Sequence, residues 1–143
     1  MKKFTALLLL ILLIFSCSTD DDEENNLLPN VPVDETIFLN NPEYINLQVV
    51  GGSVATDHGG ISGIIIYHYS TNNYIAFERS APHLRPQVCS KMTIKNGIIM
   101  FCSCDDSEFN ILNGAPLTDG VNYQARQYRV TIVSSNTLRI TNF

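Results

Sequence analysis

Positive charge is scarce in this 143-residue chain, which has nine lysines and arginines against fourteen aspartates and glutamates and a formal net charge of −5. A nucleic-acid-binding surface needs basic side chains gathered to neutralise phosphates. The sequence contains no such basic stripe. Nucleic acid is therefore not an expected partner.

Common catalytic motifs are also missing. No Gly-x-Ser-x-Gly turn presents a nucleophilic serine, and no glycine-rich loop could cradle a phosphate. Ser107 has acids beside it but no histidine at a defined spacing. We therefore predict that the chain is not an enzyme.

The N-terminus has the features of a secretory signal. Lys2 and Lys3 precede the apolar run Ala6–Phe15, which is too short to span a bilayer, and Ser16 is a small residue before a cleavage point. Because Cys17 follows directly, residues 1–16 resemble a bacterial lipoprotein signal peptide, which implies that Cys17 carries the lipid. The alternative is an ordinary signal peptide with a chance cysteine. The resemblance predicts a protein anchored to the membrane of the cell envelope (the outer membrane), facing the periplasm or the exterior.

Residues 17–35 are predicted to be a flexible tether. Five consecutive acids, Asp20–Glu24, occur there with asparagine and proline and almost no aromatic residues, a composition that cannot form a core. From residue 36 onward, seven acids balance seven bases. Residues 36–143 are therefore predicted to be one neutral folded domain, with the chain's negative charge in the tether.

The folded part is predicted to be all-β, because short β-branched and aromatic runs alternate with turn residues and no apolar run has helical spacing. Asn96-Gly97 is a strong hairpin signal, since both residues tolerate a positive φ. The pattern is typical of an antiparallel sandwich or small barrel built of hairpins, with no substantial helix. The predicted strands are Tyr44–Val50, Ile61–Tyr69, Tyr74–Phe77, Met92–Lys95, Ile98–Phe101, Phe109–Leu112, Gln127–Val133 and Leu138–Thr141.

Three cysteines remain in the domain, Cys89, Cys102 and Cys104, and an exported protein is expected to form a disulfide. A bond between Cys102 and Cys104 would be strained, because residues two apart on a strand point to opposite faces. Cys89 could pair with either of the others. Either bond would close a loop of about 15 residues, worth roughly 3 kcal/mol in the chain-entropy model.

Three stretches together resemble a Rieske iron–sulfur domain: RSAPHLRPQVC (79–89), CSCDDSEFNILNGAPLTDG (102–120) and QYRVTIVSSNTLRI (127–140). That family has Cys-x-His, a spacer and then Cys-x-x-His, followed by a Gly/Pro-containing loop and a final hairpin. The resemblance covers roughly residues 61–141 and implies a Rieske-like fold for the domain.

The four ligand positions of that family fall on Ala81, His83, Cys102 and Asp105. In the family, two cysteines hold one iron and two histidines hold the other. Each iron would keep one matching ligand here and lose one, since Ala81 has no donor atom and Asp105 replaces a histidine. Ser107 matches the family serine that hydrogen-bonds a cluster sulfur. The family disulfide falls on Cys89 and Cys104, which implies that Cys102 is a free thiol.

The resemblance leaves three functional hypotheses. The first is a domain that has lost its [2Fe–2S] cluster, holds no cofactor and acts as a binding or structural module for another, unidentified envelope protein. The second is a [2Fe–2S] electron-transfer protein with non-standard ligation. The third is a single metal ion held by His83, Cys102 and Asp105, a nitrogen, sulfur and oxygen set that would suit zinc.

Overall fold

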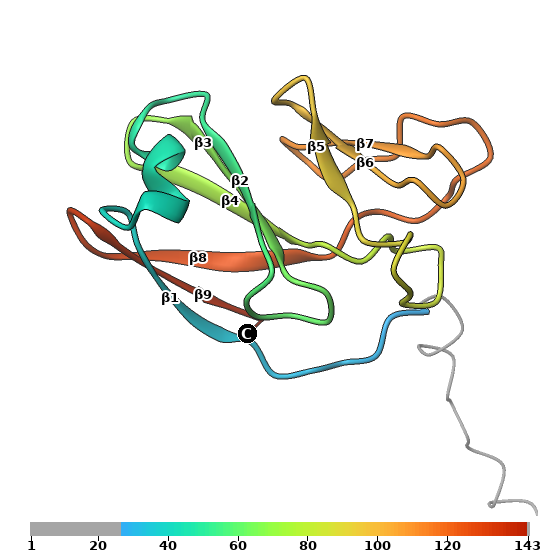
Figure 1. Cartoon of the computed structure of the whole chain (residues 1–143), viewed down its shortest axis with the longest axis horizontal. Coiled ribbons are helices and arrows are strands. Elements are labelled where there is room, and N and C mark those ends of the chain that lie inside the picture. The colour runs from blue at the N-terminus through green and yellow to red at the C-terminus, as the bar shows by residue number, and fades with distance from the viewer. Residues whose placement is uncertain (1–26, 143) are drawn as a thin grey trace, which may run out of the picture.

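The computed structural model describes residues 27–142, which form an almost entirely antiparallel β structure (Figure 1). The only helix in this part of the chain is a short 3₁₀ helix, and no helix there is long and apolar enough to cross a membrane. The elements are β1 (Asp34–Phe38), η1 (Pro42–Gln48), β2 (Ser53–Thr56), β3 (Ile64–Ser70), β4 (Asn73–Glu78), β5 (Thr93–Lys95), β6 (Ile99–Phe101), β7 (Glu108–Asn110), β8 (Gln127–Ser134) and β9 (Thr137–Thr141).

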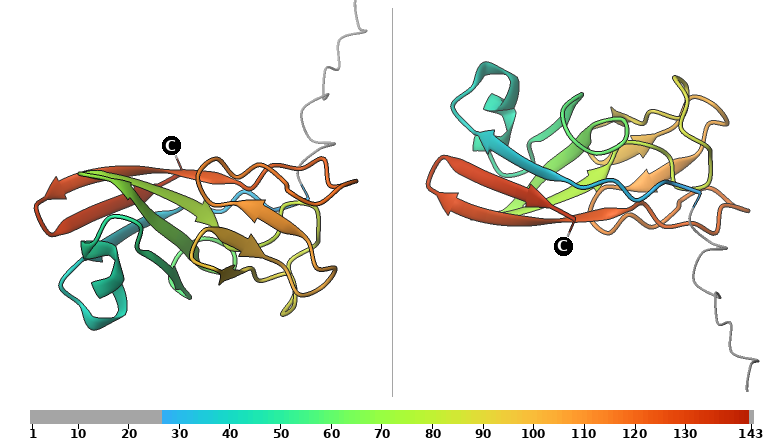
Figure 2. Two further views of the ribbon diagram at one scale, coloured as in Figure 1. Left: turned by 90° about the horizontal axis from the view of Figure 1, so that it is seen from above. Right: turned by 90° about the horizontal axis from the view of Figure 1, so that it is seen from below.

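Six strands form the large sheet, in the order β1-β9-β8-β4-β3-β2. Strand β1, the first in the chain, pairs with β9, the last, and Asp34 lies opposite Thr141. The remaining strands form a small sheet in the order β5-β6-β7. The small sheet and its loops lie toward one end of the molecule, and η1 and the β8–β9 hairpin lie toward the other (Figures 1 and 2).

The β3 strand is central to the packing because both of its faces are buried. Ile64 and Ile66 point into one hydrophobic core, beneath η1 and β1, while Ile65 and Tyr67 point into a second core beneath the small sheet. Burial of each isoleucine contributes about 1.5–3 kcal/mol. The unbroken apolar run of this strand therefore joins the two sheets, and the second core supports the loops that carry the candidate site.

Most predicted strands are confirmed, but Tyr44–Val50 is not a strand. Its N-terminal part lies in η1, where Pro42 occupies the first turn and where Tyr44 and Leu47, three residues apart, are both buried. That spacing puts them on one face of a 3₁₀ helix. The strands β1 and β2 were not predicted, because each is short and only half-buried.

The folded domain begins earlier than residue 36. Leu28 and Val33 are 3% and 1% exposed, and β1 starts at Asp34, whose carboxylate accepts two hydrogen bonds of 2.7 Å from Arg139. Scattered apolar residues in an acidic segment give no strand signal, which is why this segment was predicted to be part of the tether. The signal peptide, Cys17 and the acidic run lie outside the described residues.

Candidate functional site

Two loops at the small-sheet end carry the predicted site residues. The first follows β4 and contains residues 79–91, and the second joins β6 to β7. A disulfide between Cys89 and Cys104 ties them together, with a Cα–Cα distance of 4.9 Å, and Cys102 is a free, buried cysteine. The pairing implied by the resemblance is thus present in the structure.

The first loop is also anchored by backbone hydrogen bonds. The Ala81 N–H donates to the carbonyl of Ser90 at 2.8 Å, and the Met92 N–H donates to the carbonyl of Arg79 at 2.7 Å. These bonds turn the chain back on itself and bury Ala81 completely. Its methyl group packs in the same core as Cys102 and offers no atom that could bind a metal.

His83 and Asp105, one on each loop, bind each other directly. The His83 Nε2 and Asp105 Oδ2 atoms are 2.6 Å apart, and the Ser107 backbone N–H donates to Asp105 Oδ1 at 3.2 Å. Partial burial alone would raise the pKa of Asp105, but the hydrogen bonds from His83 and Ser107 outweigh it and lower the pKa to about 2. The carboxylate therefore stays ionised and bridges the two loops.

This arrangement is not a catalytic triad. The Ser107 hydroxyl lies 3.4 Å from His83 Nε2, the same nitrogen that contacts Asp105. A triad needs the nucleophile and the carboxylate on different ring nitrogens. The other nitrogen, Nδ1 of His83, is buried and has no hydrogen-bond partner in the described part of the chain.

The Cys102 thiol is poorly placed to react. It is completely buried and donates a weak hydrogen bond to the carbonyl of Cys89 at 3.6 Å. Burial raises the pKa of the thiol, and the negative charge of Asp105 adds to this effect. Because the thiolate is the nucleophilic form, this site favours an inert cysteine.

The donor set does not fit a [2Fe–2S] cluster. At the positions that the resemblance assigns to ligands, Ala81 supplies no donor, and Asp105 uses its carboxylate to bind His83, which the resemblance assigns to the same iron. Within residues 27–142, no three histidine, cysteine or acidic side chains are grouped so that they could hold a metal ion. The predicted set of His83, Cys102 and Asp105 therefore does not form a three-ligand centre in this structure.

Glu78, which carries no signal in the sequence, organises the start of the first loop. This fully buried carboxylate accepts hydrogen bonds from the backbone N–H groups of Ile61, Ser62 and Ser80 and from the Tyr128 hydroxyl, at distances from 2.6 to 3.1 Å. Burial raises the pKa of Tyr128, and the bond to Glu78 raises it further. A single acid at the end of a strand has no sequence signature of this role.

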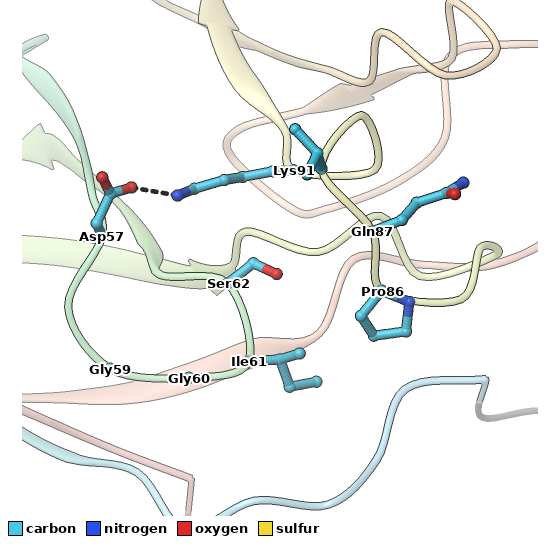
Figure 3. A pocket seen from close by; sticks show the side chains of 9 residues that line it. Asp57, Gly59, Gly60, Ile61, Ser62, Pro86, Gln87 and Lys91 are labelled. Atoms are coloured by element: carbon cyan, nitrogen blue, oxygen red, sulfur yellow. Dashed lines mark ion pairs between the residues drawn. The ribbon is translucent and has the colours of Figure 1, made fainter.

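An open pocket of about 520 Å³ separates the first loop from residues 57–62. Figure 3 shows the Lys91 side chain reaching across it to the carboxylate of Asp57. Arg79 also forms an ion pair with Asp57, which is largely exposed. The charges of this pocket are therefore already paired with one another.

No protein-family model matches the chain, and no curated protein sequence does. Among solved structures, the ferredoxin of carbazole 1,9a-dioxygenase from Nocardioides aromaticivorans IC177 matches with a TM-score of 0.50 and 15% identity, over 80% of this chain and all of that one. A weaker match is a putative NADH-dependent nitrite reductase small subunit from Mycobacterium tuberculosis, with a TM-score of 0.45 and 13% identity, over 80% of this chain and 98% of that one. At these identities the likeness concerns the fold alone: the chain has a Rieske-like ferredoxin fold.

Proposed function

We propose that this chain is a lipid-anchored protein of the cell envelope whose Rieske-like domain has lost the [2Fe–2S] cluster and serves as a binding or structural module. The observation that carries the proposal is the chemistry of two ligand positions. Ala81 has no donor atom, and Asp105 is hydrogen-bonded to His83 at 2.6 Å. A cluster would need a donor at the first position and two free ligands at the other iron.

The two loops keep their positions through contacts that involve no metal. The disulfide joins Cys89 to Cys104, and the His83–Asp105 hydrogen bond forms a second link between the same loops. Closing a loop of this length is worth roughly 3 kcal/mol in the chain-entropy model. The second core lies beneath both loops. These contacts can stabilise the site in place of a cluster.

In this proposal the domain itself is not catalytic. Ser107, His83 and Asp105 do not have the geometry of a triad, and Cys102, the one free cysteine among the described residues, is buried. The carbazole dioxygenase ferredoxin, which has the same fold, is named as the ferredoxin of an oxygenase and not as the oxygenase. By analogy, this domain would act by contacting another protein of the envelope.

The lipid on Cys17 would keep the domain close to the membrane. Leu27, the first described residue, is ten positions after Cys17. A fully extended chain spans at most about 3.6 Å per residue, so this segment reaches at most about 36 Å. Leu27 would then lie within that distance of the bilayer surface, and a partner would have to be accessible to a domain held there.

The test is to purify the protein without oxygen and measure its iron, acid-labile sulfide and visible absorption. The unaltered protein should contain neither element in stoichiometric amount and should show no cluster band. The double variant Ala81→Cys/Asp105→His restores the missing donors and should gain a cluster after reconstitution. Each single variant serves as a matched control and should remain without one. A stoichiometric cluster in the unaltered protein would overturn the proposal.

A further inference from the structure

A second pocket, of about 510 Å³, lies at the end of the molecule opposite the two loops. Its lining residues come from the β3–β4 and β8–β9 turns, the end of η1 and the residues beside these elements. Figure 1 shows these turns and η1 at the same end of the molecule. Its most distinctive lining residues are four primary amides and two rings: Asn40, Gln48, Asn72, Asn136, His68 and Tyr74. None of its ten lining residues is an aspartate, glutamate, lysine or arginine.

His68 in the wall of this pocket lacks hydrogen-bond partners for its side chain. The residue is 6% exposed, and neither ring nitrogen has a partner in the described part of the chain. Its ring stacks against Tyr74 with centroids 4.3 Å apart. Leaving a buried polar group unpaired is energetically unfavourable. A ligand that pairs one nitrogen recovers part of that cost.

The amides at the rim offer donors and acceptors. Gln48 Nε2 donates to the Leu39 carbonyl at 3.0 Å and to Asn40 Oδ1 at 3.2 Å, which orients one wall. The side-chain amides of Asn72 and Asn136 make no hydrogen bond within residues 27–142 and are exposed at the two turns. Each of them therefore has one acceptor and two donor hydrogens available to a ligand.

The chemistry of the lining selects the ligand class. A charged ligand would lose hydration and find no opposite charge, so a neutral ligand is favoured. The ring of Tyr74 offers an apolar surface beside several amide groups, a combination that matches the apolar face and hydroxyl rim of a sugar. The volume lies within the range of small-molecule sites, about 300–1,000 Å³.

We propose that this pocket binds a neutral saccharide of one or two rings. The amides of Asn72 and Asn136 hydrogen-bond its hydroxyl groups, and Tyr74 contacts its apolar face. A hydroxyl reaches a ring nitrogen of His68 after the stacked side chains rotate, because both nitrogens are covered in the free protein. This site is separate from the disulfide-linked loops and does not depend on the loss of a cluster.

The test is a saturation-transfer NMR titration of the full-length protein, held in a detergent without a sugar headgroup. The probes are glucose, galactose, mannose, N-acetylglucosamine, maltose and cellobiose. At least one should bind with a Kd of about 1 mM or tighter, equivalent to roughly −4 kcal/mol. Asn136→Ala should weaken this binding at least about fivefold. Asn122→Ala, which removes an exposed amide outside the pocket lining, is the matched control and should leave binding unchanged.

His68→Phe provides an independent variant, since it keeps the stacked ring but removes both nitrogens. It should weaken saccharide binding by a similar factor while the protein stays folded by circular dichroism. The absence of binding by all six sugars would overturn the proposal, as would equal effects of Asn136→Ala and Asn122→Ala. Binding of N-acetylglycine methylamide, a peptide-like probe, without binding of any sugar would also overturn it.

Discussion

Removal of the disulfide should weaken the domain substantially, because this bond joins the two loops of the candidate site. The bond connects residues 15 positions apart. A closed loop of that length restricts the unfolded chain and is worth about 3 kcal/mol in the chain-entropy model. The variant Cys89→Ala/Cys104→Ala should therefore lower the free energy of unfolding by about 3 kcal/mol. For a domain of roughly 100 residues, 1 kcal/mol corresponds to about 4 °C in Tm, so we expect a loss of about 12 °C.

The assay is urea denaturation followed by circular dichroism, with the same buffer for each protein and no reductant. Cys102→Ala is the matched control, because it also removes a cysteine from this site but leaves the bond intact. It removes one buried sulfur atom and should cost about 1 kcal/mol, in the range of ordinary core truncations. Adding reductant should destabilise the unaltered protein and leave the double variant unchanged.

Two results would refute this reasoning. One is an equal loss for Cys102→Ala and for the double variant, since the bond between Cys89 and Cys104 would then contribute nothing beyond a buried side chain. The other is a double variant as stable as the unaltered protein. In that case the His83–Asp105 contact and the second core would hold the loops without help from the disulfide.

Two further predictions concern Asp105 and Cys17. The pKa of Asp105 is lowered from 3.8 to about 2. Its contribution to the free energy of unfolding is therefore present above pH 3.8 and is lost as the pH falls through 2. Because the carboxylate is partly exposed, we discount this contribution to about 1 kcal/mol. Asp105→Asn should flatten the dependence of the free energy of unfolding on pH between pH 5 and pH 2, measured by urea denaturation. The control Asp106→Asn should leave the slope of this dependence unchanged. Equal slopes for both variants would contradict the proposed role of Asp105. Cys17→Ala should abolish incorporation of radiolabelled palmitate and release the protein from the membrane fraction. The control Ser18→Ala should do neither. Membrane attachment of the Cys17→Ala variant would refute lipid anchoring.

The strands with an unmistakable sequence signal were predictable, for a local physical reason. Asn96 and Gly97 both adopt a positive φ, of 55° and 76°, in the turn between β5 and β6. That requirement is local and can be read from the two residues. The long apolar run of β3 was likewise recognisable, because a strand buried on both faces needs apolar side chains at nearly every position.

The helix η1 and the strand β1 were not predictable in the same way, because their stability comes from distant partners. Asp34 pairs with Arg139, 105 residues away in the chain. Leu47 in η1 is buried in the core that also contains β9 residues. A short segment whose partners lie so far along the chain carries little local signal of its own.

The amino-acid sequence by itself determined which atoms are available at the candidate site: no donor at Ala81, a carboxylate at Asp105 and three cysteines in the domain. The covalent structure of each side chain fixes which donor atoms it has, and the fold does not change them. Only the tertiary structure decided which of these groups meet. His83 and Asp105 are 22 residues apart and come within 2.6 Å because two loops pack over one core. Contacts of that kind depend on the packing of the whole domain, since no local pattern encodes the distance between two loops.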